Sequence, residues 1–191
     1  MLCGFVSVHI ACGFYTNPDQ RELALIDQTG KNNSKPSDAS SLIGIPVLIN
    51  IPKIGVNAVI RRVGVEKDGS MGVPSLPRDA AWYMLGPKPG ELGSAVISGH
   101  VNWYSGAKGS FERVKYLKPG DKIIVQDDKG KKTTFVVRRT REYGYQENAT
   151  DVFYSNDGKS HLNLITCSGV WLRSAHIYSK RLVVFADKVT E

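Results

Sequence analysis

The sequence predicts a mainly β fold, a sandwich or a barrel, for the part of the chain that begins at residue 45. From there, short segments rich in Val and Ile recur at regular spacing, separated by Gly, Pro and Asp residues. The sequence contains no long segment with helical periodicity and no internal repeat. Its 191 residues, 41% hydrophobic and 23% charged, suffice for one globular domain and an appendage.

The first 44 residues are predicted to lie outside this domain. Residues 1–15 are apolar and uncharged apart from His9. They are fewer than the roughly 20 residues that a membrane span needs, and no Lys or Arg precedes them as in a signal peptide. We interpret them as an anchor or signal whose first residues are missing here, with a buried terminal strand as the alternative. Residues 16–44 are polar and predict a flexible linker with a short helix at 21–27.

Within the domain, apolar and β-branched segments predict the strands. They lie at 47–51, 58–63, 94–98, 122–126, 133–139, 161–166 and 178–188. The turn residues at 127–130 (DDKG) join two of these strands into a hairpin. Short helical pieces are predicted at 79–83, 110–116 and 148–154.

Charge and cysteine content exclude several classes of protein. The net charge of +7 favours anionic partners, but the Lys and Arg residues are dispersed, so we predict no nucleic-acid binding. Cys3 and Cys12 lie in the apolar N-terminal stretch, which leaves Cys167 alone in the domain. Three cysteines without a spacing pattern predict neither a disulfide framework nor a zinc site, whereas one Cys in a domain that also carries His is a pattern for a nucleophile.

Cys167 follows a buried strand and precedes a Ser-Gly pair, where we expect the strand to end. Because side chains alternate along a strand, Thr166 faces one side with the leucines before it, and Cys167 faces the other. A thiol at the end of a rigid strand is well placed to act as a nucleophile. The alternative is a small buried side chain of the core, a common role of unpaired Cys.

Among the four histidines, His100 is the best placed to exchange protons with a thiol. His9 lies in the terminal segment, and His161 is six residues from Cys167 on one strand, roughly 20 Å away. His176 lies in the loop before the last strand. His100 directly follows the strand predicted at 94–98 and the flexible Gly99.

Arg181 opens the last apolar segment, RLVVFA. A guanidinium beside a core strand can donate hydrogen bonds to a carbonyl or an oxyanion. A surface ion-pair partner is the alternative, which the spacing alone leaves open.

Three segments together resemble the signature segments of the sortases, cell-surface cysteine transpeptidases of mostly Gram-positive bacteria. They are 93–100 (GSAVISGH), 164–167 (LITC) and 181–186 (RLVVFA), in the family's order of His, Cys and Arg. The segment 117–121 (LKPGD) resembles the family's link into a central strand, and the resemblance extends over about 47–189. In its finer features the chain is similar to class F or class E sortases.

The resemblance implies an eight-stranded β-barrel over 45–191, anchored by its N-terminus at the extracellular face of the cell membrane. It implies Cys167 as nucleophile, His100 as acid and base, and Arg181 as the residue that stabilises the substrate carbonyl or oxyanion. Surface proteins with a sorting signal resembling Leu-Pro-x-Thr-Gly would be cleaved between Thr and Gly through a thioester. An amine of a cell-wall precursor or a pilin would then accept the acyl group.

Two further expectations concern ligands. We expect no cofactor and no metal, because the calcium-binding acidic cluster of one sortase class is not evident. Thr166, Trp103 and Trp171 are predicted to bind substrate, with Tyr104 as a further residue of the groove and core packing as the alternative for the aromatic side chains.

Other classes fit less well. An L,D-transpeptidase-like cysteine enzyme would carry a Ser-x-Gly-Cys-x-Arg signature, which is missing here, and a papain-like peptidase would place Cys before His. The non-enzyme alternative is an envelope-anchored β-barrel binding module in which Cys167 is buried and unreactive.

Overall fold

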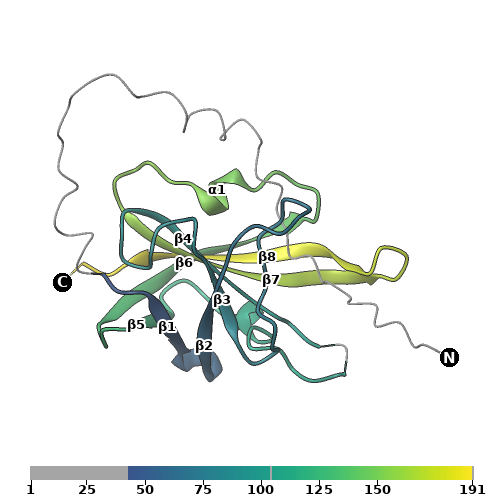
Figure 1. Cartoon of the computed structure of the whole chain (residues 1–191), viewed down its shortest axis with the longest axis horizontal. Helices are drawn as coiled ribbons and strands as arrows, with labels where there is room; N and C mark the ends of the chain where they lie inside the picture. Colours follow the sequence, from purple (N-terminus) through teal and green to yellow (C-terminus); the bar gives the residue numbers. More distant parts are fainter. Residues whose placement is uncertain (1–42, 104, 191) are drawn as a thin grey trace, which may run out of the picture.

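In the computed structural model, which describes residues 43–103 and 105–190, eight strands close into one β-barrel (Figure 1). The strands are β1 (Pro46–Ile51), β2 (Val56–Val63), β3 (Ala80–Tyr83), β4 (Gly93–Gly99), β5 (Lys122–Asp127), β6 (Lys132–Gly144), β7 (Ser160–Leu172) and β8 (Ile177–Lys188). Their order around the barrel is β1-β2-β3-β4-β7-β8-β6-β5, and only the β2–β3 and β4–β7 pairs in these strands are parallel. The predicted barrel is confirmed.

Alternation of side chains fills the interior of this barrel. Alternate residues of the strands point inward, for example Leu162 and Leu164 of β7 and Leu182 and Val184 of β8. Phe111, just before the 3-10 turn η4 (Val114–Tyr116), is fully buried in the same core. A second 3-10 turn, η3 (Pro52–Ile54), links β1 to β2.

A second apolar cluster lies on the outer face of β7 and β8, beneath the short helix α1 (Thr150–Phe153). It consists of Met71, Val96, Tyr143, Ala149, Val152, Ile165, Cys167, Val183 and Phe185. The Nδ2 group of the buried Asn163 donates a hydrogen bond of 2.6 Å to the carbonyl of Val152, which holds α1 over β7. Cys167 therefore lies on the covered outer face of the barrel, on the side of β7 that alternation predicted.

Two local predictions were wrong. The helical piece expected at 79–83 is strand β3, because Ala80 and Ala81 are fully buried and pair with β2 on one side and β4 on the other. Tertiary pairing overrides the helical preference of two alanines here. Strand β7 does not end at Cys167 but runs to Leu172, with an irregularity between Ser168 and Trp171.

The strand directions define two ends of the barrel. At the end that we call the base, β4 and β7 begin and β8 finishes, so Gly93 pairs with Ser160 and His161 with Asp187. The chain enters β1 and leaves β8 there, at the left of Figure 1. At the opposite end, which we call the top, β4 finishes and the β7–β8 hairpin projects.

Several predictions concern residues outside the described part of the chain. These residues are the apolar segment 1–15, the helix at 21–27, nearly all of the linker 16–44, and Tyr104. Within residues 43–103 and 105–190, no helix is long and apolar enough to cross a membrane.

Candidate active site

Strands β7 and β8 place Cys167 and Arg181 directly opposite each other at the top of the barrel. Directly opposed residues of an antiparallel pair project to the same face, with Cβ atoms roughly 4.5–5.5 Å apart. Cys167 is 5% exposed and Arg181 is 1% exposed. The structure thus brings the predicted nucleophile and the predicted cation onto one sheltered surface.

Arg181 is a buried charge whose orientation the backbone fixes. Its Nη1 group donates hydrogen bonds of 2.9 Å to the carbonyls of Tyr178 and Lys180. A buried guanidinium is costly unless such bonds compensate its lost hydration. Arg181 is therefore buried on the Cys167 face and is not an exposed residue that forms a surface ion pair.

His100 follows directly after β4 and reaches the same level of the barrel. In the parallel β4–β7 ladder Ser98 pairs with Ile165, and the same register carried two residues further sets His100 level with Cys167. The Thr166 hydroxyl donates a hydrogen bond of 2.9 Å to the carbonyl of Gly99. This bond ties the residue before His100 to the residue before Cys167.

A backbone carbonyl fixes the orientation of the His100 ring. Its Nε2 lies 2.7 Å from the carbonyl oxygen of Pro74. A carbonyl only accepts hydrogen bonds, so Nε2 carries a hydrogen and Nδ1 is the nitrogen that gains or loses the exchangeable proton. The indole of Trp103 meets the imidazole edge to face, with ring centroids 4.9 Å apart.

Burial lowers the pKa of His100 below its usual value near 6.5, and the hydrogen bond to Pro74 offsets part of this shift. A group with a lowered pKa holds its proton less firmly, because desolvation disfavours the charged imidazolium. At neutral pH the neutral ring therefore predominates, with Nδ1 able to accept a proton.

The residues predicted to bind substrate are placed differently from one another. Thr166 is 2% exposed and uses its hydroxyl for the bond to Gly99. Trp103 contacts the His100 ring, whereas Trp171 is 39% exposed in the β7–β8 hairpin and packs edge to face on Tyr178, with centroids 5.2 Å apart. Trp171 follows Cys167 by four residues, beyond the irregularity of β7 between Ser168 and Trp171.

The sequence analysis missed the group that orients His100 and the network that holds α1. The sequence pattern assigned no role to Pro74. Tyr143 donates a hydrogen bond of 2.6 Å from its hydroxyl to Oδ2 of Asp151 in α1. Arg139 and Arg141 lie 3.6 and 3.7 Å from the same carboxylate oxygen. Burial, together with Asp151, raises the pKa of Tyr143 to about 12, so its hydroxyl stays a donor.

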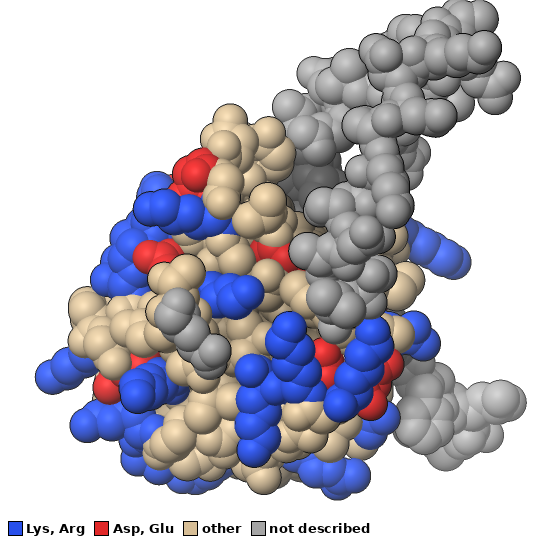
Figure 2. Space-filling model, turned by 90° about the vertical axis from the view of Figure 1, so that its left-hand side faces the viewer, with Lys and Arg blue, Asp and Glu red and all other residues tan. Residues whose placement is uncertain are grey.

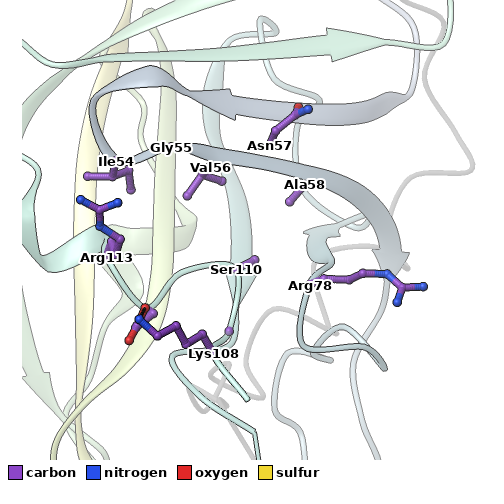
Figure 3. Close-up of a pocket in the computed structure, with 11 residues that line it drawn as sticks. Ile54, Gly55, Val56, Asn57, Ala58, Arg78, Lys108, Ser110 and Arg113 are labelled. Carbon is purple, nitrogen blue, oxygen red and sulfur yellow. Dashed lines mark ion pairs between the residues drawn. The ribbon is translucent and has the colours of Figure 1, made fainter. Parts of the chain in front are cut away.

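The described residues contain no group of three or more His, Cys, Asp or Glu side chains that could hold a metal ion. A cavity of about 310 Å³ lies elsewhere, between the start of β2 and the segment 108–113 (Figure 3).

Comparisons with known proteins decide the family. A family model described as the sortase domain matches residues 49–189. The chain belongs to the sortase family. It is a sortase-type cysteine transpeptidase, from a family associated with the cell surface. A comparison with curated proteins found no match.

Solved sortase structures share the fold at low sequence identity. Sortase C-1 from Actinomyces oris is 19% identical with a TM-score of 0.59, over 86% of this chain and 85% of that one. Group B Streptococcus pilus island 1 sortase C2 is 20% identical with a TM-score of 0.57, over 75% and 73%. Sortase C-1 from Streptococcus pneumoniae is 19% identical with a TM-score of 0.58, over 76% and 67%. At these identities the likeness establishes the barrel rather than a substrate.

Proposed function

We propose that this sortase cleaves a sorting signal resembling Leu-Pro-x-Thr-Gly between Thr and Gly and transfers the acyl group to an amine of a cell-wall precursor or a pilin. The observation that carries the proposal is the cross-strand pairing of Cys167 with the buried Arg181, with His100 at the same level. Nucleophile and cation come from the paired strands β7 and β8, and the proposed proton carrier directly follows the neighbouring strand β4, so a rigid scaffold determines their geometry.

In the proposed reaction, the Cys167 thiol first gives its proton to Nδ1 of neutral His100. The resulting thiolate attacks the Thr carbonyl carbon, and a C–S bond forms. The carbonyl oxygen gains negative charge, which the guanidinium of Arg181 stabilises by donated hydrogen bonds. Protonated His100 gives its Nδ1 proton to the Gly nitrogen as the C–N bond breaks, leaving a thioester and a free amine. The acceptor amine then attacks the thioester, neutral His100 takes its proton, and the thiolate leaves.

Supporting roles follow from the placement of the neighbouring side chains. We propose Trp103 and Trp171 as substrate contacts, Trp103 beside His100 and Trp171 further along the hairpin. For Thr166, the bond to Gly99 favours a positioning role, in which its hydroxyl keeps His100 level with Cys167. Assignment to class F or class E stays a prediction.

The proposed location is the extracellular face of the membrane, with residues 1–15 as anchor and 16–44 as linker. The Ile43 carbonyl, where the described chain begins, accepts a hydrogen bond of 3.0 Å from Nζ of Lys88. Figure 2 views the base and shows many Lys and Arg side chains there. The exposed lysines of this end include Lys129, Lys131, Lys132, Lys159 and Lys188. The positive charge at this end of the barrel favours its placement against an anionic surface. The top of the barrel, with Cys167, then faces away from that surface.

Turnover of a fluorogenic Leu-Pro-x-Thr-Gly peptide in the presence of a glycine amide tests the proposal, with the ligated product measured by mass spectrometry. We expect Cys167→Ala to abolish cleavage and ligation, and Arg181→Lys to lower kcat because ammonium cannot reproduce the guanidinium fork. Arg173→Lys, in the exposed hairpin, is the matched control and should leave both unchanged. Cleavage that persists in a folded Cys167→Ala variant would refute the assignment.

A further inference from the structure

One edge of β2 lacks a strand partner over its first half. Within the described residues, Val56 to Val59 pair with β1, but the ladder with β3 begins only at Ile60. In an antiparallel pair, every second residue directs both its N–H and its C=O away from the partner strand. This stretch therefore presents backbone donors and acceptors on the side where a longer β3 would lie, and such an edge is a template for another strand.

That open edge lines a cavity rather than flat surface. The cavity holds about 310 Å³ and lies between Ile54–Ala58, the residue Arg78, and the segment 108–113 (Figure 3). Its volume is at the lower end of the roughly 300–1,000 Å³ typical of ligand sites. Four strand residues span about 13 Å, which matches a short extended peptide.

Basic residues outnumber acidic ones in the lining of the cavity, with Arg78, Lys108 and Arg113 against Glu112. Arg113 lies at one end beside Ile54 and Gly55, and Arg78 lies at the other end beyond Ala58 (Figure 3). No carboxylate of the described residues lies within 4 Å of the Arg113 guanidinium.

The acids nearby are already engaged. Glu112 pairs with Lys108 at 3.5 Å. Asp79, just before β3, is buried and receives a hydrogen bond of 2.8 Å from Arg61. Arg78 lies 4.0 Å from Asp79 but has an 81% exposed side chain, which leaves it free to swing toward a ligand. The cavity therefore carries an excess of positive charge.

We propose that this cavity binds an extended, acidic peptide segment of a partner protein, which adds a short strand to the open edge of β2. Peptide backbone groups would pair with the outward N–H and C=O groups of Val56–Val59, as in other strand-addition sites. Acidic side chains of the peptide would meet Arg78 and Arg113. The site is separate from Cys167 and Arg181, which lie on β7 and β8, and the inference is independent of the proposed sorting signal.

The test uses the full chain, labelled with ¹⁵N, and the blocked peptide Val-Glu-Val-Glu-Val. We expect saturable shifts of the amide signals of 56–59 that weaken as salt is added. The matched peptide Val-Lys-Val-Lys-Val should produce none. An acidic peptide with N-methylated backbone amides keeps the charge but loses donors, and should bind at least about tenfold more weakly, a loss of about 1.4 kcal/mol.

Charge reversal localises the site. The double variant Arg78→Glu, Arg113→Glu should lose binding of the acidic peptide, and Arg173→Glu, in the remote hairpin, should retain it. Arg78, Arg113 and Arg173 are all exposed. The amide spectrum of each variant, compared with that of the wild type, checks that the variant is folded.

Three results would overturn the proposal. The first is the absence of saturable amide shifts at millimolar concentrations of the acidic peptide. The second is binding that neither the double variant nor N-methylation of the peptide weakens. The third is a concentration-dependent dimer that protects the same amides without peptide. The last result would assign the edge to a second copy of this chain.

Discussion

The change Thr166→Val tests how the fold holds His100 beside Cys167. Valine keeps the shape of the side chain but removes the hydroxyl that donates to the Gly99 carbonyl at 2.9 Å. Thr166 is 2% exposed, so water cannot replace the lost donor. Leaving a buried carbonyl without its partner costs about 1–3 kcal/mol. For a domain of this size, each kcal/mol lowers the melting temperature by about 2–4 °C. We therefore expect a fall of about 2–12 °C.

The kinetic consequence separates positioning from substrate binding. Gly99 immediately precedes His100, so loss of the bond allows His100, the proposed proton carrier, to move away from the level of Cys167. A displacement of about 1 Å from productive geometry can cost about a hundredfold in rate. At a temperature where the variant is folded, we expect kcat on the sorting-signal peptide to fall about 10–100-fold while KM changes less than about threefold.

Thr140→Val, at an exposed position of β6, serves as the matched control and should change neither melting temperature nor kcat. An increase in KM with unchanged kcat would contradict a positioning role and indicate that Thr166 contacts the substrate.

Three further perturbations follow from the same contacts. Burial lowers the pKa of His100 below its value in the unfolded chain, so its contribution to stability is fully present above pH about 6.5 and is lost as pH falls below it. Denaturation should therefore show that the difference in unfolding free energy between wild type and His100→Gln changes with pH. A difference that stays constant with pH would contradict this prediction. Tyr143→Phe removes the donor to the α1 carboxylate and should lower the free energy of unfolding in urea by about 1 kcal/mol. Tyr116→Phe, at an exposed position, should leave it unchanged, and equal effects of the two changes would contradict a stabilising role of this hydrogen bond. Gly99→Ala would bring a Cβ within 2.5–2.8 Å of the buried Phe111 ring, so we expect about 1–3 kcal/mol of destabilisation by calorimetry and reduced kcat, and wild-type behaviour would show that the ring can yield.

The barrel was predictable because its strands are regular in sequence. Period-two patterns around Leu162 and Leu164 set both the strand and its inward face, and the turn at 127–130 set the β5–β6 hairpin. The segment at Ala80 failed because its neighbours on both sides, and not its own propensity, make it a strand.

The site was predictable only in part. The resemblance to sortases named Cys167 and His100, but their spacing along the chain gives no register between strands. The burial of Arg181 follows from its pairing with Cys167, a contact across a hairpin that sequence spacing left open. The carbonyl of Pro74 reaches His100 from a loop 26 residues earlier, and backbone acceptors carry no mark in the side-chain pattern.

In the proposed reaction, Cys167 forms a thioester with the substrate acyl group. Intact-protein mass spectrometry after acid quenching, with sorting-signal peptide present and acceptor amine omitted, tests it most directly. We predict a mass increase equal to the peptide up to and including Thr, less one water, mapped to the fragment that contains Cys167 and reversed by hydroxylamine. A panel of such peptides that leaves no adduct on wild-type enzyme, or an adduct of the same mass on Cys167→Ala, would contradict it.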